Sequence, residues 1–326
     1  MAQSSLTRIG HSNTDAAVEF AQDVFTGLSD TPRWLPCKYL YDQRGSELYE
    51  SICDQSEYYP TRTEAAILER YARDIQMATG PVSLIELGSG TSVKTDYLLD
   101  AYTRAGGSVH YVPVDVSESA LQIAADAIMD RRPGVTVEGI VGTYETAFHL
   151  FRDHSPAMVV FLGSTIGNLN DHESNQFLTA LAGSVSRGDY FLLGVDLVKD
   201  HELISAAYND AAGMTAQFTT NVFARMNREL NAGVDLDQIK HVARYEPARQ
   251  RMEIFVEFLT EQIVNLAPVE KRIRVGAGEK VMIEISHKFV LGDLTEHVAQ
   301  FGFEVQQTYT DDNQWFGLLL MKRTTD

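Results

Sequence analysis

The chain has 326 residues, more than one domain usually contains, so we expect either one large domain with an insertion or two closely associated lobes. Its formal net charge of -18 argues against a nucleic-acid partner, because nucleic-acid binding depends on lysines and arginines that neutralise phosphates. Residues 1–10 lack the apolar segment of a signal peptide, and no run approaches the roughly 18 apolar residues of a membrane span. We therefore expect a cytoplasmic protein that binds neither nucleic acid nor membrane.

The cysteines and histidines give no sign of a metal site. Cys37 and Cys53 are the only cysteines, too few for a disulfide framework or a zinc site. The nine histidines show no H-x-x-x-H or H-E-x-x-H pairing. The sequence therefore predicts no metal.

The first 80 residues are more than a polar tail. A helix is expected over residues 15–28, and two aromatic-rich segments follow at 37–42 and 45–50. Thr61 and Glu64 have the spacing of a capping box and precede apolar positions. We therefore expect a second helix to begin at Thr61.

An apolar run at 83–87 ends in a turn of small residues, Gly88, Ser89 and Gly90. The run fits a buried parallel strand, and the glycines remove side chains that would keep a ligand away from the backbone. The turn therefore predicts a nucleotide-like cofactor.

The spacing of the turn separates two classes of cofactor. A dinucleotide site has the pattern G-x-G-x-x-G, but Val93 occupies the third glycine position. The turn also lacks the Gly-Lys-Ser/Thr ending of a P-loop, because Gly90 is followed by Thr91, Ser92 and Val93 and the lysine comes only at Lys94. The E-x-G-x-G pattern that begins at Glu86 resembles the turn of Rossmann-like S-adenosylmethionine (SAM) methyltransferases. Taken alone, the turn favours SAM over NAD and leaves a purely structural turn open.

From residue 82 to residue 195, short apolar runs alternate with amphipathic stretches. This alternation is typical of β-α units that build a parallel sheet, whose ligands bind at the carboxyl ends of the strands. We expect strands at 82–87, 109–115, 135–141, 158–163 and 190–195, and helices at 94–105, 117–131, 145–151 and 173–184.

After residue 196 the pattern changes, which predicts an inserted lobe. Alternating segments at 241–245 and 251–260, broken by Glu246 and Pro247, predict a β-hairpin. The other expected elements are helices at 201–213, 214–231 and 294–301 and strands at 271–275, 281–289, 303–309 and 315–321, the last helix and two strands closing the sheet.

Two strand ends carry polar groups that suit a ligand. Asp115 ends the second expected strand, where a carboxylate can accept hydrogen bonds from the ribose hydroxyls of an adenosine; a helix N-cap is the alternative. The loop at 161–169 offers glycines, hydroxyls and an amide, which suit a small zwitterion better than a flipped base. An ordinary strand-to-helix turn is the alternative there.

Four ordered motifs, at 57–64, 86–92, 161–168 and 194–200, together resemble the histidine Nα-methyltransferases of ergothioneine biosynthesis, and the likeness runs from about Trp34 to the C-terminus. The resemblance implies an α/β fold: a Rossmann-like SAM-methyltransferase domain with an additional α+β substrate-binding lobe. It also implies that L-histidine is converted to Nα,Nα,Nα-trimethylhistidine (hercynine) by three methyl transfers from SAM, each releasing S-adenosylhomocysteine.

On this basis the expected methyltransferase domain comprises residues 62–200 and 287–326. The expected substrate-binding lobe comprises residues 1–61 and 201–286. The chain is expected to act as a monomer.

The resemblance implies a set of cofactor-binding residues. Bacterial family members have Asp-Phe where this chain has Thr143 and Tyr144, and Thr143 cannot accept the adenine amino hydrogen bond as a carboxylate would. This departure concerns adenine recognition rather than methyl transfer. Lys94 lies near an expected helix start, where the dipole disfavours a cation, so the methionine carboxylate of SAM would give a reason for it. The implied residues are Gly88, Ser89, Gly90, Lys94, Asp115, Thr143 and Tyr144.

The resemblance also implies how the amino acid is held. Asn168 and Tyr208 match the pair that holds the carboxylate. Glu284 and Ser286 match the pair that recognises the imidazole, and Thr165 lies beside the amino group. The implied substrate-binding residues are Tyr41, Tyr49, Tyr58, Gly163, Asn168, Tyr208, Glu284 and Ser286, with Tyr58 and Thr165 as the catalytic residues.

The residues agree with these roles without requiring them. Glu284 and Ser286 are two apart on an expected strand, so they face one side and can both bond an imidazole, although a polar strand face is the simpler interpretation. Tyr208 is expected in the middle of a helix, where a tyrosine more often packs in the core or on the surface than binds a ligand. Tyr41 and Tyr49 would be core aromatics by default, but aromatic faces suit a trimethylammonium group.

Three other functions stay open. The nearest is N-methylation of another amino acid such as tryptophan, which would leave Glu284 unpaired at a cost of about 1 to 3 kcal/mol. A non-catalytic SAM-binding regulator is the second. An NAD oxidoreductase is the third, and the missing third glycine weighs against it.

Overall fold

The computed structural model describes residues 4–9, 13–90, 94–106 and 108–325, which fall into two compact units. The first unit comprises residues 1–10, 60–198 and 289–326, and the second comprises residues 11–59 and 199–288. Val93, at the missing third glycine position, lies outside the described residues.

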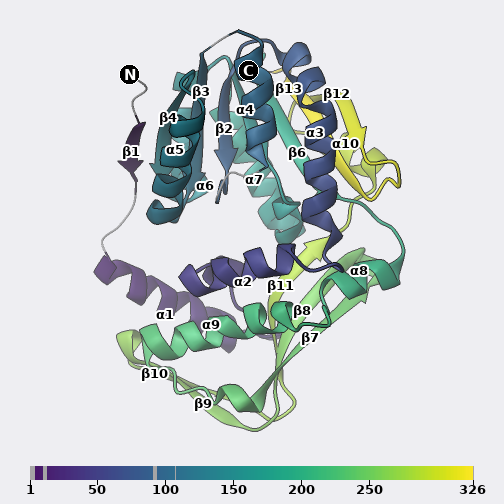
Figure 1. Ribbon diagram of the computed structural model, residues 1–326. Coiled ribbons are helices and arrows are strands. Elements are labelled where there is room, and N and C mark those ends of the chain that lie inside the picture. Colours follow the sequence, from purple (N-terminus) through teal and green to yellow (C-terminus); the bar gives the residue numbers. More distant parts are fainter. Residues whose placement is uncertain (1–3, 10–12, 91–93, 107, 326) are drawn as a thin grey trace. The chain divides into compact units, whose positions relative to one another are not determined.

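The first unit is built on an eight-stranded sheet with the order β1-β4-β3-β2-β5-β6-β13-β12 (Figure 1). Neighbouring strands from β1 to β6 are parallel, and β13 runs antiparallel to β6 and β12. The strands are β1 (Ser4–Arg8), β2 (Ser83–Leu87), β3 (Val109–Asp115), β4 (Val135–Val141), β5 (Ala157–Phe161), β6 (Tyr190–Asp196), β12 (Phe303–Thr310) and β13 (Phe316–Arg323).

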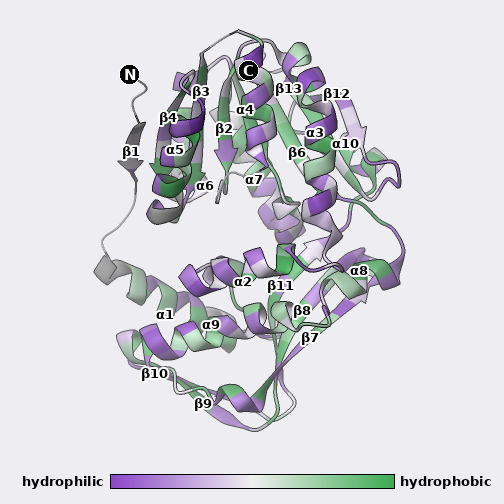
Figure 2. Ribbon diagram, viewed as in Figure 1, coloured by the Kyte–Doolittle hydropathy of each residue, from purple (hydrophilic) through white to green (hydrophobic). Residues whose placement is uncertain are grey.

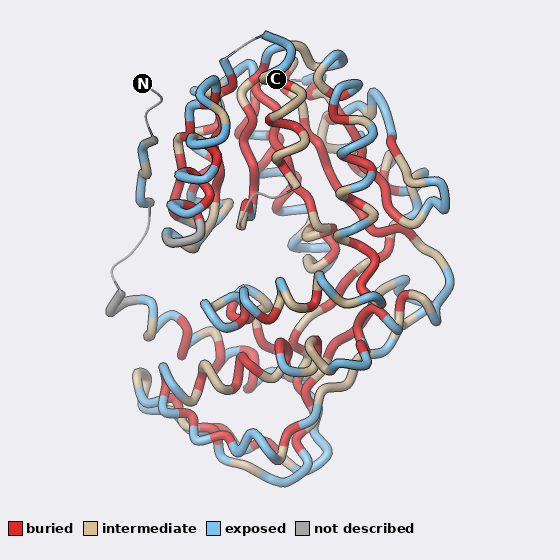
Figure 3. Tube along the Cα trace, viewed as in Figure 1, coloured by how far each residue is buried: buried red, intermediate tan, exposed pale blue. Residues whose placement is uncertain are grey.

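Helices cover both faces of this sheet, and the central strands are therefore apolar and buried (Figures 2 and 3). One apolar cluster joins one face of the sheet to α3 (Tyr59–Thr79), α4 (Thr95–Arg104) and α5 (Glu118–Arg131). A second joins the other face to α6 (Tyr144–Ala147), η2 (Phe148–His154), η3 (Thr165–Asn168), α7 (Asp171–Ser184) and α10 (Leu291–Ala299).

The predicted β-α alternation and closing antiparallel strands are confirmed, with two local differences. The helix expected at 145–151 is one turn of α-helix, α6, followed by the 3-10 helix η2. Strand β1 was not predicted, because its five residues carry little apolar signal and it is stabilised by parallel pairing with β4.

The predicted capping box at Thr61 is wrong. Helix α3 already begins at Tyr59, so Thr61 lies inside it. Pro60 sits in the first turn, where its missing N–H is tolerated. Glu64 is fully buried and makes contacts in the interior of the first unit.

The second unit combines helices with two small sheets (Figure 1). The predicted hairpin is confirmed: β7 and β8 pair antiparallel, and β11 joins β8 on its other side. Strands β9 and β10 form a separate antiparallel pair. The elements are α1 (Asn13–Ser29), η1 (Cys37–Leu40), α2 (Gln43–Cys53), α8 (His201–Ala207), α9 (Met214–Leu230), β7 (Ile239–Glu246), β8 (Arg251–Phe258), β9 (Gln262–Leu266), β10 (Lys271–Val275) and β11 (Lys280–His287).

The helix expected at 201–213 is wrong beyond residue 207. Helix α8 ends at Ala207, and Tyr208 is its C-cap residue rather than a mid-helix residue. The Asp210 carboxylate accepts hydrogen bonds from the N–H groups of Met214 and Thr215, at 2.7 and 2.8 Å, and so fixes the start of α9. Among the described residues, no helix has the length and hydropathy that crossing a membrane requires.

Candidate active site

The glycine turn after β2 has the backbone conformation that its sequence requires. Gly88 and Gly90 have φ angles of +66° and +48°, in the left-handed region that favours glycine. A Cβ added at Gly88 would lie 2.7 Å from the Tyr144 hydroxyl oxygen, whereas one at Gly90 would have no described atom within 4 Å. The turn therefore brings Gly88 and Tyr144, two of the expected cofactor-binding residues, against each other.

Asp115 holds this turn from the end of β3. Its Oδ2 accepts a hydrogen bond from the Gly90 N–H at 3.0 Å, and its Oδ1 accepts one from the Ser117 N–H at 2.9 Å. One carboxylate therefore fixes both the glycine turn and the chain that leads into α5. Each carboxylate oxygen can accept a second hydrogen bond, so the geometry still admits ribose hydroxyls.

Ser89 provides a test of whether a polar ligand fits here. Its side chain is buried, and within the described part of the chain its hydroxyl has no hydrogen-bond partner. A buried unpaired hydroxyl costs about 1 to 3 kcal/mol, which a ligand hydrogen bond would remove. This orphaned group beside two glycines fits a polar cofactor such as SAM.

Thr143 and Tyr144 have different local roles. Thr143 is the N-cap of α6, and its hydroxyl accepts a hydrogen bond from the Thr146 N–H at 3.4 Å. The ring of Tyr144 packs edge-on against Phe161 and Phe177, with centroid distances of 5.5 and 6.4 Å. The hydroxyl of Thr143 is thus engaged in capping, while Tyr144 extends an aromatic cluster towards the glycine turn.

Glu64 is a site residue that the sequence interpretation missed. Its carboxylate accepts the Gly163 N–H at 2.8 and 3.0 Å and forms an ion pair with Lys94. The carboxylate expected opposite Lys94 is therefore supplied by the chain itself. Glu64 shares a helical face with Ile67, Leu68 and Tyr71, and this periodicity was the signal that it points inward.

A second buried carboxylate supports the same region. Burial raises the pKa of Glu86 to about 7, although hydrogen bonds from the hydroxyls of Thr95 and Tyr111 and the charge of Lys94 act in the opposite direction. Glu86 therefore ties the end of β2 to the start of α4 and to β3. It supports the turn from inside the core.

The loop after β5 has a constrained backbone. Gly163 and Ser164 have φ angles of +77° and +56°. The Ser164 hydroxyl accepts the Asp196 N–H at 2.9 Å, and the Thr165 hydroxyl donates to the Leu162 carbonyl at 2.9 Å. Asn168 is half-buried at the end of η3. The loop thus carries Gly163, Thr165 and Asn168 together at the carboxyl end of β5.

The second unit brings the expected substrate-side tyrosines into one aromatic cluster. The ring centroids of Tyr41 and Tyr49 are 5.7 Å apart, those of Tyr49 and Tyr58 are 6.3 Å apart, and those of Tyr58 and Tyr208 are 6.3 Å apart. Phe218 of α9 completes the cluster, at 5.3 Å from Tyr41 and 6.1 Å from Tyr49. Phe218 was missed because it lies on the apolar face of a helix and looks like a core residue in the sequence.

Tyr58 is held as a neutral phenol. Its side chain is buried, and burial raises its pKa well above the ordinary value, with the nearby tyrosines acting in the same direction. A phenol in this state can donate one proton and accept another, but it does not provide a phenolate base at neutral pH.

Glu284 and Ser286 lie on one face of β11. The pairing with β8 shifts register between Met282 and Glu284 and is regular from Glu284 to His287, so side chains two apart point to the same side. Burial raises the pKa of Glu284 to about 7, and the nearby Lys288 charge partly opposes this rise. Glu284 can therefore change its charge near neutral pH.

Tyr208 and Ser286 are joined through Lys288. The Tyr208 hydroxyl donates to the Ser286 hydroxyl oxygen at 2.8 Å, and the Lys288 ammonium donates to both oxygens at 2.8 and 2.9 Å. His241 Nε2 also donates to the Tyr208 carbonyl at 3.1 Å. Asn168, the other residue expected to bind the substrate carboxylate, lies in the first unit, at the end of η3.

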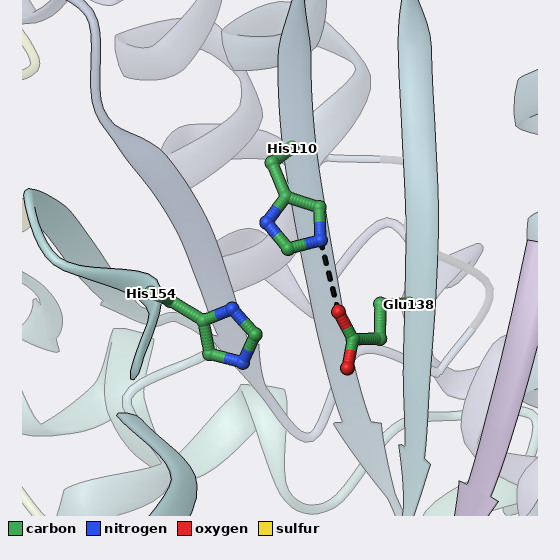
Figure 4. A group of neighbouring side chains, drawn as sticks. All are labelled: His110, Glu138 and His154. Atoms are coloured by element: carbon green, nitrogen blue, oxygen red, sulfur yellow. Dashed lines mark hydrogen bonds and ion pairs between the residues drawn. The ribbon is translucent and has the colours of Figure 1, made fainter. Parts of the chain in front are cut away.

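One group in the first unit could supply metal ligands: His110 of β3, Glu138 of β4 and His154 of η2 (Figure 4). Their ligand atoms lie within 4.8 Å of one another, and burial lowers the pKa of His154. His110 Nε2 and Glu138 already form a hydrogen bond of 3.1 Å. Histidines far apart in sequence form this group, so the spacing of histidines along the chain could not reveal it.

Comparison with known proteins shows which protein family this chain matches. Residues 20–323 match the family described as "Histidine-specific methyltransferase, SAM-dependent". The histidine N-alpha-methyltransferase of Mycolicibacterium smegmatis is 41% identical over 308 residues, which cover 94% of this chain and 96% of that protein. That of Mycobacterium tuberculosis is 41% identical over 311 residues, covering 95% and 97%. The L-tryptophan methyltransferase of Psilocybe serbica is 26% identical over 329 residues, covering 92% and 91%.

Proposed function

This chain belongs to the family of histidine-specific, SAM-dependent methyltransferases, and we propose that it converts L-histidine to Nα,Nα,Nα-trimethylhistidine, hercynine, in three methyl transfers. Its close relatives bear the name histidine N-alpha-methyltransferase. The reaction would be the first step of ergothioneine biosynthesis. Residues 62–200 and 287–326 are proposed as the methyltransferase domain, and residues 1–61 and 201–286 as the substrate-binding lobe, except that β1 (Ser4–Arg8) pairs with β4 in the sheet of the first unit.

The observation that carries the choice of substrate is the pair Glu284 and Ser286 on one face of β11. A neutral imidazole has one N–H donor and one acceptor nitrogen, so it can donate to a carboxylate and accept from a hydroxyl. This pair offers both groups from a single rigid strand. It supports a histidine side chain more specifically than it supports an apolar one.

The residues of the glycine turn are proposed to bind SAM, whose sulfonium supplies the methyl group. Asp115 would accept the ribose hydroxyls, and Gly88 and Gly90 would allow close approach of the backbone. Ser89, whose hydroxyl has no hydrogen-bond partner among the described residues, would gain one. Lys94 would contribute positive charge for a carboxylate, shared with Glu64. Thr143 and Tyr144 are proposed to lie on the adenine side.

The α-amine must lose a proton before each transfer, because only its lone pair can attack the sulfonium methyl group. We propose Tyr58 and Thr165 as the residues that help to carry this proton away. Tyr58 is suited to relaying, since it stays neutral and can donate and accept at once. Gly163 and Asn168 are proposed to hold the amino acid backbone, and Tyr208 is proposed to act beside the side chain, because its hydroxyl hydrogen is donated to Ser286.

The aromatic cluster of the second unit is proposed to bind the ammonium group as it acquires methyl groups. A trimethylammonium cannot donate a hydrogen bond, so its binding depends on aromatic faces and apolar contact. Tyr41 and Tyr49 offer such faces in a group that also contains Tyr58 and Phe218.

The test is mass spectrometry of the purified protein with L-histidine and SAM. We expect mono-, di- and trimethylhistidine, with hercynine accumulating. Glu284→Ala should lower kcat/KM for histidine by about 10- to 100-fold, the loss expected for a hydrogen bond to a charged group. SAM binding by calorimetry without any methylated amino acid would instead indicate a non-catalytic regulator.

A second candidate, methylation of tryptophan, is favoured by the similarity to the L-tryptophan methyltransferase of Psilocybe serbica. Against it, an indole offers a single donor and no acceptor nitrogen, which leaves the Ser286 side of the pair unmatched. Turnover measured side by side with histidine and tryptophan separates the two.

We further propose that the chain acts as a monomer. Light scattering coupled to size-exclusion chromatography tests this, and a monomer is expected. The proposed substrates are small metabolites of the cytoplasm, which is the compartment proposed for the protein.

A further inference from the structure

Lys288 is a buried cation that none of the roles above uses. It follows β11 directly, only 2% of its surface is exposed, and its ammonium lies 4.8 Å from the centroid of the Tyr208 ring. Burying an ammonium is unfavourable unless hydrogen bonds and nearby charge compensate it. A buried lysine at this position therefore needs specific hydrogen bonds or charges that compensate its burial.

The hydrogen bonds of Lys288 constrain two hydroxyls. An ammonium can only donate, so the oxygens of Tyr208 and Ser286 each accept one hydrogen bond from it. These two hydroxyls also bond to each other at 2.8 Å, which uses one of their two hydrogens. The other hydrogen must then point away from the trio. Lys288 thus makes the pair a donor of one hydrogen bond to an acceptor outside it.

The same ammonium also acts on Glu284. The positive charge favours the ionised form of this carboxylate and opposes the rise in its pKa that burial causes. Glu284 and Ser286 are neighbours on one strand face, so a single cation influences both halves of the imidazole-recognising pair. It favours an acceptor at Glu284 and a donor at the hydroxyl pair.

We propose that Lys288 is a positioning residue for substrate selection: it holds the hydroxyls of Tyr208 and Ser286 as a hydrogen-bond donor and Glu284 as an acceptor, the arrangement that matches a neutral imidazole. This inference rests on the proposed histidine specificity. Lys288 does not touch the reacting nitrogen in this scheme, and it acts through the three neighbouring side chains.

The experiment compares Lys288→Met, Lys288→Gln and wild type, with Lys280→Met as the matched control. Methionine keeps length and removes the charge and the donor, whereas glutamine keeps a donor without the charge. Lys280 lies on the same strand and its side chain is 46% exposed. The measurements are steady-state kinetics with histidine and with tryptophan, SAM affinity by calorimetry, and the thermal midpoint.

We expect Lys288→Met to lower kcat/KM for histidine by about 10- to 100-fold, mostly by raising KM. The ratio of kcat/KM for histidine to kcat/KM for tryptophan should therefore decrease. Lys288→Gln should recover part of the loss. SAM affinity should stay unchanged, and Lys280→Met should stay within about twofold of wild type throughout. A purely structural role would instead lower the thermal midpoint and SAM binding together, with the preference intact.

Two results separate this inference from the proposed function. If wild type forms hercynine and Lys288→Met keeps the wild-type preference for histidine, the role of Lys288 is wrong and the function stands. If wild type methylates another amino acid in preference to histidine, the proposed function itself fails. Should Lys288→Met not fold, Lys288→Gln carries the comparison, and a wild-type preference in that folded variant overturns the inference.

Discussion

At the scale of single residues, the glycine turn separates two effects of replacing a glycine: backbone strain at a positive φ angle and the clash of an added Cβ with a neighbouring atom. Gly88 and Gly90 both have positive φ, so alanine at either position is strained by about 1 to 2 kcal/mol. Only at Gly88 would the new Cβ also meet another group, the Tyr144 hydroxyl at 2.7 Å.

We therefore expect Gly88→Ala to weaken SAM binding more than Gly90→Ala, by about tenfold, measured by calorimetry. Combining Gly88→Ala with Tyr144→Phe removes the oxygen in the way and should restore affinity towards that of Gly90→Ala. Equal affinities for the two single variants would show that the Tyr144 contact has no part in the effect.

Glu284 gives a pH dependence with a defined sign. Its pKa is raised to about 7, so its ionised, hydrogen-bond-accepting form increases as pH rises through that value. Histidine affinity is expected to strengthen from pH 6 to pH 8, by up to about tenfold per pH unit where the carboxylate is mostly protonated. Calorimetric titrations across this range measure the slope.

The matched control for that profile is Glu284→Gln. The substrate imidazole titrates in the same range, with an ordinary pKa of about 6.5, and this contribution persists in the glutamine variant. Subtracting the two profiles isolates Glu284. Identical pH profiles of histidine affinity for wild type and Glu284→Gln would mean that ionisation of Glu284 does not contribute to histidine binding.

At the scale of elements, sequence alone predicted the parallel strands well. β3 and β4 have the predicted bounds. Their apolar residues are buried, in a nearly continuous run in β3 and in alternation with Thr136 and Glu138 in the first half of β4. Helix α8 was predicted too long, since the Asp210 cap that begins α9 depends on a local turn after Tyr208.

The side-chain clusters were harder to predict, for a different reason. Tyr208 is 78 residues from Ser286 and 80 from Lys288, and only the folded chain brings their polar atoms together. Glu64 likewise reaches Gly163, 99 residues away. Motif spacing reports contacts within a turn or a strand, so it indicated Gly88, Gly90 and Asp115, whereas the substrate-side residues came from family likeness. Glu64, Phe218 and Lys288 were not predicted as site residues.

Helix α9 contributes Phe218 to the aromatic cluster, and this placement yields a prediction about product distribution. Phe218→Leu keeps an apolar side chain but removes an aromatic face beside Tyr41 and Tyr49. Because cation–π contact contributes about 0.5 to 2 kcal/mol, KM for dimethylhistidine should rise by about 2- to 30-fold. Mass spectrometry should show dimethylhistidine accumulating, with the thermal midpoint as the check on folding. An unchanged ratio of dimethyl to trimethyl product would exclude Phe218 from cation binding.

At the scale of the whole molecule, the glycine turn of the first unit is proposed to bind SAM and the Glu284–Ser286 pair of the second unit to bind the imidazole, and a pair of variants tests this division. Asp115 in the first unit holds the glycine turn through Gly90, and Glu284 in the second unit lies beside Ser286. Asp115→Asn keeps the size of the side chain but removes the charge that would accept two ribose hydroxyls. We expect it to weaken SAM binding by about 10- to 100-fold, as for other charged hydrogen bonds, and Glu284→Gln to leave SAM binding within about twofold.

Histidine binding should respond in the opposite way. Calorimetry with histidine, at a SAM or S-adenosylhomocysteine concentration that saturates each variant, should show a weaker complex for Glu284→Gln and an unchanged one for Asp115→Asn. Saturation matters because histidine binding that requires prior cofactor binding would otherwise make an Asp115 effect look like a histidine effect. A loss of histidine affinity in saturated Asp115→Asn, equal to that in Glu284→Gln, would show that the glycine turn also determines amino acid binding. The assignment of the glycine turn to SAM alone would then be wrong, even if both substrates are correct.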